Sequence, residues 1–155
     1  MFELHSQLAA DTVAIGQFRL SLVLLHKDAN FPWVILVPKR EAIREIYHLD
    51  EADQAQLMRE SSHLSEVLTS IYAPDKINVA SLGNMVPQLH LHHVARYESD
   101  VAWPGAVWGN FMPKKYSEEE LEKVVSRLRS SLSGEDFEAA SNVEVSSVSS
   151  AGFTP

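Results

Sequence analysis

Residues 83–96 read Gly83-Asn84-Met85-Val86-Pro87-Gln88-Leu89-His90-Leu91-His92-His93-Val94-Ala95-Arg96. Side chains two positions apart in a β-strand point to the same face of a sheet. In a strand that begins at Gln88, the residues Gln88, His90 and His92 therefore share one face. The opposite face receives Leu89, Leu91 and His93. Two imidazoles and a carboxamide in one row supply a nucleophile, hydrogen-bond donors and a proton source to a single small cleft.

Three interpretations of this polar row are open. It is a half-solvated strand that happens to carry histidines, a metal site, or a site of covalent catalysis by histidine. Imidazoles at positions i and i+2 can chelate zinc or copper, but a structural zinc site usually has four ligands, often thiolates, and the chain has no cysteine. A metal site would therefore need further histidines that the fold brings to the strand, from among His5, His26, His48 and His63.

The segment resembles the signature of the histidine triad (HIT) superfamily of nucleotide hydrolases and transferases. In that family one strand carries three histidines at alternate positions, each followed by a hydrophobic residue, after a Gly-Gln-Ser/Thr-Val loop. Aligning residues 83–86 with this loop places Gln88 at the first triad histidine, His90 at the second and His92 at the third. The second histidine is the nucleophile in the family, so the resemblance implies that role for His90. A rival register makes His92 the nucleophile and leaves Val94 at the third position.

The departures from the family pattern bear on catalysis. Gln88 replaces a histidine, Asn84 replaces a glutamine, and Met85 stands where a Ser or Thr hydroxyl commonly assists near the leaving group. A glutamine amide still donates a hydrogen bond to a phosphate oxygen, but it cannot carry a proton on and off. The change preserves binding better than acid catalysis, so a noncatalytic nucleotide-binding or regulatory module is the alternative function.

Other segments agree with the resemblance, which spans about residues 1–110. Asn78 lies just before the glycine loop, and Trp103-Pro104-Gly105 is similar to a Trp-Pro segment in the nucleoside-phosphoramidase branch. The motif Val37-Pro38-Lys39-Arg40 resembles the end of an early strand of the family. The resemblance implies substrate contacts from Asn78, Gly83, Asn84 and Trp103, and a ribose contact from His26, Asp28 or Asn30.

The resemblance also implies a mechanism. Neutral His90 attacks the α-phosphorus of a nucleotide and forms a nucleotidyl-histidine intermediate, which water resolves. His92 bonds to phosphate oxygens or protonates the leaving group, and Gln88 stabilises nonbridging oxygens. The implied substrates are dinucleoside polyphosphates such as diadenosine tetraphosphate, nucleoside phosphoramidates or acyl-adenylates. No cofactor is expected, Mg²⁺ enters only as a counterion of the substrate, and the family commonly forms homodimers through the long helix and a sheet edge.

Composition narrows the class of protein. The chain has 155 residues, of which 45% are hydrophobic and 22% charged, as is ordinary for one globular domain. A net charge of −8 argues against nonspecific binding to nucleic acid. A small phosphorylated ligand needs only local donors and one or two cations, which could come from Lys39, Arg40, Arg96, Lys114 or Lys115. Without a signal-like or membrane-spanning stretch, we expect a cytoplasmic protein with no membrane partner.

Hydrophobic periodicity predicts an α+β fold with about five mostly antiparallel strands and two main helices, and the resemblance implies that this fold is HIT-like. Strands are expected at 20–25, 33–37, 76–80 and 88–96. One long helix starts at Asp50 and stops before Pro74, and a second starts at the capping box beginning with Ser117 and ends by Gly134. A HIT-like domain is therefore expected at 1–134, followed by a flexible or loosely packed tail at 135–155.

Overall fold

The computed structural model describes residues 1–109, 111–134 and 136–141, and its main element is one antiparallel sheet. Six strands pair in the order β4-β5-β3-β2-β1-β6. Their bounds are β1 Thr12–Gln17, β2 Ser21–His26, β3 Trp33–Pro38, β4 Lys76–Ala80, β5 Leu91–Arg96 and β6 Glu138–Ala139. The predicted α+β fold is confirmed, and β1 and the short strand β6 are additional to the strands located in the sequence.

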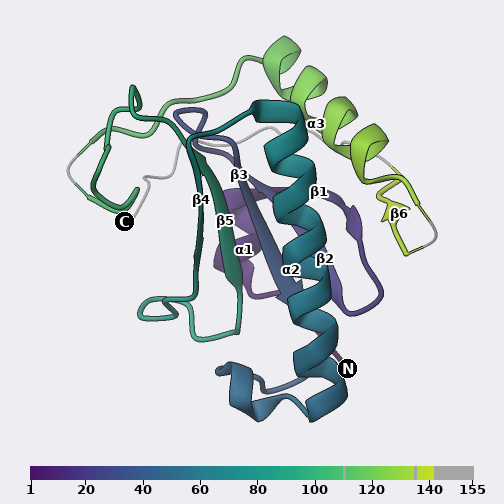
Figure 1. Ribbon diagram of the computed structural model, residues 1–155. Helices are drawn as coiled ribbons and strands as arrows, with labels where there is room; N and C mark the ends of the chain where they lie inside the picture. The colour runs from purple at the N-terminus through teal and green to yellow at the C-terminus, as the bar shows by residue number, and fades with distance from the viewer. Residues whose placement is uncertain (110, 135, 142–155) are drawn as a thin grey trace.

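Helices cover both faces of the sheet (Figure 1). The long helices α2 (Glu51–Tyr72) and α3 (Glu118–Leu132) lie on one face, and the short helix α1 (Ser6–Asp11) lies on the other. A 3-10 turn, η1, spans Ile46–His48. Asp50 caps α2 by accepting the backbone N–H of Asp53, and Ser117 starts α3 with the predicted capping box. Both main helices therefore begin at the residues that the sequence indicates.

The two faces of the sheet carry separate hydrophobic clusters. Val34 and Leu36 of β3 pack in the cluster with α2 and α3, whereas Trp33, Ile35 and Val37 pack in the cluster with α1. This alternation follows from the pleat of a strand that is buried on both sides. On the face that carries Trp33, the ring of His92 lies beside the indole.

The histidine segment enters the sheet later than the sequence predicts. We expected a strand from Gln88, but β5 begins at Leu91. Leu89 donates its backbone N–H to the carbonyl of Ile43, so residues 88–90 bond outside the ladder. The predicted alternation is still present, because Leu89 and Leu91 pack in the α2 cluster and Nε2 of His93 lies 2.7 Å from Oγ of Ser61 on α2.

Part of the segment predicted to be a loose tail is described, and it adds to the sheet. Gly16 and Gln17 of β1 pair with β6, and Phe137 packs edge-on against Phe18 with 5.7 Å between ring centroids. A side chain at Gly16 would collide with the backbone of Glu138, so this contact requires glycine. Residues 142–155 of the predicted tail lie outside the described residues.

In the described part of the chain, no helix is both long enough and apolar enough to cross a membrane.

Candidate active site

The two histidines His90 and His92 lie side by side on the α1 face of the sheet. Their ring centroids are 4.9 Å apart and the rings meet edge to face. His92 is on β5, where it pairs with Ile35 of β3, and His90 immediately precedes that strand. Their exposed fractions are only 6% and 7%, so both imidazoles are largely withdrawn from bulk water.

The tautomer of His90 is set by its own loop. Nδ1 lies 2.7 Å from the backbone carbonyl of Gln88, which can only accept, so Nδ1 carries the proton. Nε2 of neutral His90 then holds a lone pair, and it has no hydrogen-bond partner among the described residues. An imidazole held in this way is a nucleophile, because its attacking nitrogen is free while the opposite nitrogen is stabilised.

His92 has the opposite tautomer. The indole Nε1–H of Trp33 donates to Nδ1 of His92 at 2.9 Å, so Nδ1 must be unprotonated. The proton of the neutral ring is therefore on Nε2. A nucleophilic nitrogen on one ring and an N–H donor on its neighbour form a complementary pair for a phosphate group.

Burial keeps these rings uncharged near neutral pH. Desolvation lowers the pKa of His90, partly offset by its bond to the Gln88 carbonyl, and the charge of His5 lowers it further. Desolvation also lowers the pKa of His92 to about 3, and the neighbouring charges of His90, His26 and His93 act in the same direction. Two closely spaced imidazoles in a dry environment cannot both accept protons without a large cost.

Aromatic rings surround His92. Trp33 contacts it at 5.6 Å between centroids, and Trp108 meets it edge-on at 4.9 Å. His26 stacks flat on Trp33 at 3.9 Å, and burial lowers the pKa of His26 to about 4 despite the charges of Asp11 and Asp28. Trp33 and Trp108 were not among the predicted site residues, since their roles depend on which strands and loops adjoin His92.

The side-chain amide of Gln88 is not free to bind a ligand beside the two imidazoles, because it is already hydrogen-bonded. Its Oε1 accepts the backbone N–H of His5 at 2.9 Å, and its Nε2 donates to the carbonyl of Glu3 at 2.9 Å. Both hydrogen-bonding groups of the side chain are thus used to hold the N-terminal segment. The sequence offered no signal for this pairing, because 83 and 85 residues separate the partners.

Asn78 and Trp103, which are predicted to contact substrate, both lie against a buried arginine. Oδ1 of Asn78 accepts from Nη1 of Arg96 at 2.7 Å, and the ring of Trp103 lies 5.8 Å from the guanidinium carbon. Asp100 accepts two further bonds, from Nε and Nη2 of Arg96, at 2.8 and 3.1 Å. Arg96, one of the cations we considered for phosphate, is 1% exposed and committed to this cluster.

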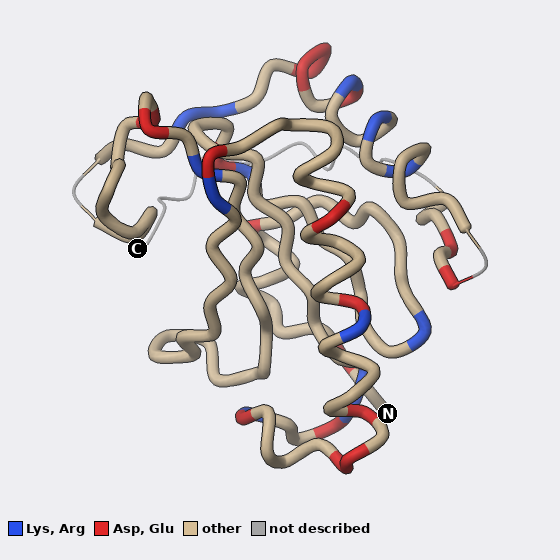
Figure 2. Tube along the Cα trace, viewed as in Figure 1, with Lys and Arg blue, Asp and Glu red and all other residues tan. Residues whose placement is uncertain are grey.

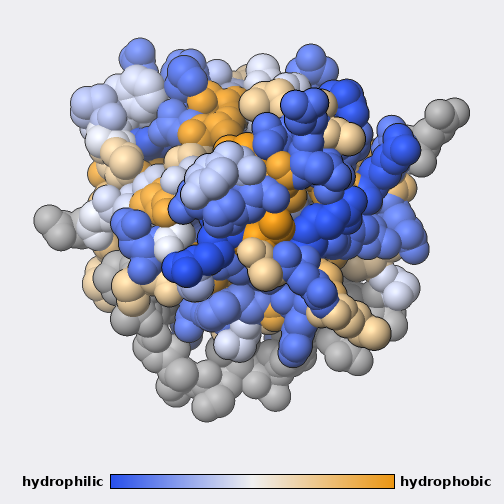
Figure 3. Space-filling model, turned by 90° about the horizontal axis from the view of Figure 1, so that it is seen from below, coloured by the Kyte–Doolittle hydropathy of each residue, from blue (hydrophilic) through white to orange (hydrophobic). Residues whose placement is uncertain are grey.

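The glycine loop is open to solvent. Gly83 has a φ of 74°, a left-handed conformation that glycine adopts without strain, and Asn84 after it is exposed. Met85 is 71% exposed, whereas Val86 anchors the loop in the α1-side cluster. Figure 3 views the end of the molecule where this loop lies and shows a mostly hydrophilic surface with small apolar patches.

The hairpin loop between β2 and β3 is held by Asp28. Its Oδ1 accepts from the backbone and side chain of Asn30 and from the backbone N–H of Lys114. Asn30 also donates to the carbonyl of Met112. Of the three predicted ribose ligands, Asp28 and Asn30 therefore serve the loop, and His26 is the one that contacts the aromatic group around His92.

Charged side chains are absent from the β4–β5 loop and the histidine segment. No Lys, Arg, Asp or Glu occurs from Ala80 to Ala95, and Figure 2 shows this stretch as an uncoloured part of the trace. Within the described residues, no group of three or more His, Asp or Glu side chains is arranged to hold a metal ion.

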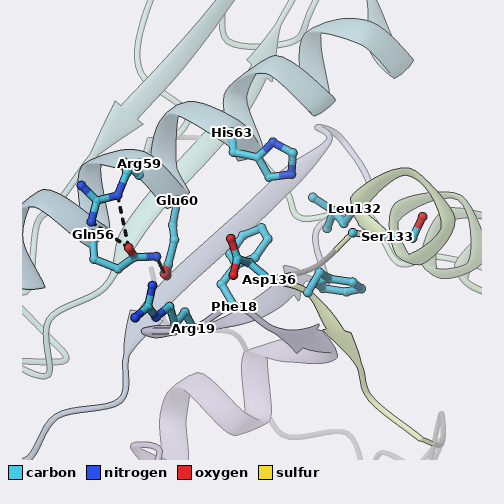
Figure 4. A pocket seen from close by; sticks show the side chains of 11 residues that line it. Phe18, Arg19, Gln56, Arg59, Glu60, His63, Leu132, Ser133 and Asp136 are labelled. Carbon is cyan, nitrogen blue, oxygen red and sulfur yellow. Dashed lines mark hydrogen bonds between the residues drawn. The ribbon is translucent and has the colours of Figure 1, made fainter.

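A separate cavity of about 590 Å³ lies on the α2 side, between α2, the β1–β2 turn and the end of α3 (Figure 4). Glu60 and Asp136 both line it, and Glu60 accepts from the backbone N–H groups of Leu20 and Ser21 and from Gln56. His63, the imidazole at this cavity, packs edge-on against Phe18. The cavity therefore lacks the paired neutral imidazoles found on the other face.

A six-stranded antiparallel sheet that carries a buried pair of imidazoles beside its β5 strand defines a histidine triad domain. The sequence matches the HIT domain family over residues 7–99, more than half of the chain. The protein therefore belongs to the HIT family.

Solved structures of HIT proteins resemble it over nearly their whole length. The histidine triad protein from Marinobacter aquaeolei VT8 is 54% identical, with a TM-score of 0.83, and the match covers 85% of this chain and 96% of that one. The protein from Bradyrhizobium japonicum is 49% identical, with a TM-score of 0.82 and coverage of 84% and 97%. The protein from Sinorhizobium meliloti 1021 is 39% identical, with a TM-score of 0.82 and coverage of 85% and 98%. No curated protein matches the chain.

Proposed function

We propose that the protein is a nucleotide hydrolase or transferase in which Nε2 of His90 attacks the α-phosphorus of a nucleotide. The observation that carries the proposal is the 2.7 Å bond from Nδ1 of His90 to the Gln88 carbonyl. This bond holds the ring in the tautomer whose other nitrogen is free to form a bond to phosphorus. The lowered pKa of His90 keeps that lone pair available near neutral pH.

The reaction proceeds in two displacements. In the first, the Nε2–P bond forms while the bond from phosphorus to the leaving oxygen breaks, and the leaving group keeps that electron pair. The Nδ1–H of the resulting positively charged ring stays bonded to the Gln88 carbonyl, which disperses the charge. In the second, water or another acceptor attacks phosphorus, the N–P electron pair returns to Nε2, and the proton of the attacking water passes to solvent.

His92 serves this reaction as a hydrogen-bond donor. Its Nδ1 is occupied by the indole N–H of Trp33, so its Nε2–H is the group available to a phosphate oxygen. Delivering that proton to the leaving group would require a second proton on Nδ1, which the Trp33 bond and burial both oppose. We therefore assign His92 to charge stabilisation rather than to acid catalysis.

The substrates that this function implies are dinucleoside polyphosphates, whose phosphate leaving group departs without a proton. The family resemblance also suggests nucleoside phosphoramidates, in which a P–N bond breaks and the departing nitrogen takes its proton from solvent. A nucleotide is thus the proposed small-molecule partner, and Gly83 and Asn84 lie on the loop nearest in sequence to the histidines. A cytoplasmic location stays a prediction. So does a homodimer formed through the long helix and a sheet edge, for which β4 and β6 are the two edges available.

A noncatalytic nucleotide-binding module is the second candidate, and the bonding of Gln88 favours it. With the amide of Gln88 held by Glu3 and His5, the site has no replacement acid at the first triad position. Such a module would be stabilised by nucleotides and would form no covalent bond to them.

Trapping of a labelled nucleotide separates these functions. The protein is mixed with an α-³²P-labelled dinucleoside polyphosphate, quenched, and digested to locate the label. We expect the label on His90, none in His90→Ala, and full labelling in His63→Ala, a matched histidine variant at the other cavity. Label on His92 would establish the rival register, and ligand-induced stabilisation without any label would establish the binding module.

A further inference from the structure

The N-terminal segment is docked on the same face of the sheet as the paired imidazoles. Phe2 and Leu4 pack against the α1-side cluster, in which Leu8 is buried. Between them in sequence, Glu3 and His5 present their backbone groups to the amide of Gln88. Apolar packing and two hydrogen bonds therefore hold this segment at the site, although the family match begins only at residue 7.

Gln88 links this segment directly to the nucleophile. Its side chain bonds the backbone of Glu3 and His5, while its own carbonyl accepts the Nδ1–H of His90. An amide presents its donor and its acceptor side by side, so it can bond two backbone groups of one extended segment. An imidazole points its two nitrogens in different directions and could not make both bonds. The replacement of the first triad histidine by Gln88 thus fits a role in holding the N-terminal segment.

The ring of His5 is oriented by helix α1. Its Nδ1 accepts the backbone N–H of Gln7 at 3.1 Å, which makes His5 the N-cap of that helix. The proton of the neutral ring is then on Nε2, and Nε2 has no hydrogen-bond partner among the described residues. His5 and His90 are also bonded to the same residue, because the backbone N–H of His5 donates to the Gln88 side chain and Nδ1 of His90 lies 2.7 Å from the Gln88 carbonyl. Burial is the main cause of the lowered pKa of His90, and the charge of His5 acts in the same direction.

We propose that His5 supplies the imidazole missing from position 88, and that its Nε2–H donates a hydrogen bond to a phosphate oxygen of the nucleotide held at His90. Gln88 is then a positioning residue, which acts by holding the backbone of His5. No proton is transferred in this contact. The inference rests on the proposed function insofar as it places a nucleotide phosphate at His90.

Three substitutions of His5 separate donation from helix capping. Asparagine is a strong N-cap residue but too short to place a donor where Nε2 lies, whereas the amide nitrogen of glutamine reaches about that position and caps poorly. Alanine does neither. If His5 donates to phosphate, His5→Gln stays near wild type while His5→Asn and His5→Ala are both impaired. If His5 only caps α1, His5→Asn stays near wild type and His5→Gln does not.

The readouts are the dissociation constant for AMP, measured by calorimetry, and the rate of labelling of His90. We expect His5→Asn and His5→Ala to weaken AMP binding about tenfold or more, the usual loss for a hydrogen bond to a charged group. Labelling should slow about a hundredfold in the same variants, as when one donor to a developing oxyanion is removed. Thermal melting of each variant checks that the fold is retained.

The positioning role of Gln88 is tested by coupling. We expect Gln88→Ala to weaken AMP binding as His5→Asn does, and the double variant to lose little more than either single one, because both remove the same contact. Additive losses, or any other order of the His5 variants, would overturn the proposal.

The proposal for His5 and the catalytic function can fail separately, because AMP binding needs no chemistry. Wild type that binds AMP without labelling of His90 would refute the catalytic function, and the AMP affinities of the His5 variants would still test the hydrogen bond from His5. Wild type that does not bind AMP would overturn both.

Discussion

The indole Nε1–H of Trp33 donates a hydrogen bond to Nδ1 of His92 at 2.9 Å, across two neighbouring strands of the sheet. The bond is buried, and it can exist only while Nδ1 of His92 is unprotonated. A tryptophan on β3 therefore selects the tautomer of a histidine on β5. It leaves His92 with a single outward donor and makes protonation of the ring costly.

Replacing Trp33 by phenylalanine tests this control. Trp33→Phe keeps an aromatic ring but removes the N–H donor, so Nδ1 of His92 becomes free to carry a proton. We expect nitrogen NMR to show a Nε2–H tautomer in wild type and a mixture in the variant, with labelling of His90 about tenfold slower, the scale of one lost hydrogen bond. Trp108→Phe is the matched control, because Trp108 contacts His92 only through its ring. Identical NMR spectra of wild type and Trp33→Phe would contradict the assignment.

The labelling rate should fall at acid pH with a midpoint below the ordinary pKa of histidine. Burial lowers the pKa of His90, so Nε2 keeps its lone pair as the pH falls from 7 through 6.5, the value of an unperturbed imidazole. We expect the second-order labelling rate to stay level across that interval and to fall only at lower pH. A pH series with wild type and His5→Asn makes the measurement, and a midpoint at or above 6.5 in wild type would refute the prediction.

The stability of the fold should fall as the pH drops below about 6.5. Burial lowers the pKa of His92 to about 3 and the pKa of His26 and His93 to about 4. Between these values and pH 6.5, the unfolded chain therefore binds more protons than the folded protein does. The stabilisation is complete above pH 6.5 and is lost as the pH falls through the interval down to 4 or 3. Each histidine contributes a slope of at most about 1.4 kcal/mol per pH unit in that interval.

Urea unfolding at several pH values measures this slope, and single substitutions identify its sources. His93 is fully buried against Ser61 of α2, far from solvent and on the other face from His90. We expect His93→Gln, which keeps a polar group there but does not titrate, to flatten the pH dependence. His63→Gln, at an exposed position, should leave the slope unchanged. Equal slopes in wild type and His93→Gln would show that burial of His93 does not control the acid limb.

Local patterns in the sequence were sufficient to predict the α+β class, most of the strands, the helix caps and the placement of His90 beside His92, because these depend on residues close together in the chain. The pairing of β3 with β5 joins residues far apart in the chain and was not predicted. Other parts of the site depend on distant partners. Gln88 bonds the N-terminal segment because residues 88–90 leave the ladder, which alternation of polar and apolar residues does not reveal. Trp108, and not Trp103, lies against His92, because the loop after β5 folds Trp103 over Arg96.

Of the two strands that were not expected, β1 and β6, the short strand β6 was missed for a similar reason. Only two residues form it, and its pairing with β1 depends on the absence of a side chain at Gly16 and on Phe137 reaching Phe18. A two-residue strand has no periodicity of its own. Segments of this kind are specified by the surface that they cover and not by their own composition.

Substitution of Arg96 tests whether this cation is structural or binds phosphate. Its guanidinium is 1% exposed and bonds Asp100, Asn78 and the carbonyl of Gly105. Although burial raises the pKa of Asp100, the bonds from Arg96 and from backbone N–H groups lower it to about 2. A lysine ammonium cannot make the several hydrogen bonds of the planar guanidinium, so Arg96→Lys leaves buried acceptors unpaired. We expect this substitution to lower the free energy of unfolding by about 3 kcal/mol.

The matched control is Arg40→Lys, since Arg40 pairs with Asp53 at the surface with 46% of its side chain exposed. An exposed pair contributes about 0–1 kcal/mol, so this variant should unfold at nearly the wild-type urea concentration. Folded Arg96→Lys should bind AMP as wild type does, because the wild-type guanidinium is already bonded to Asp100, Asn78 and the Gly105 carbonyl. Weakened AMP binding at wild-type stability would instead assign Arg96 to the nucleotide and contradict its structural role.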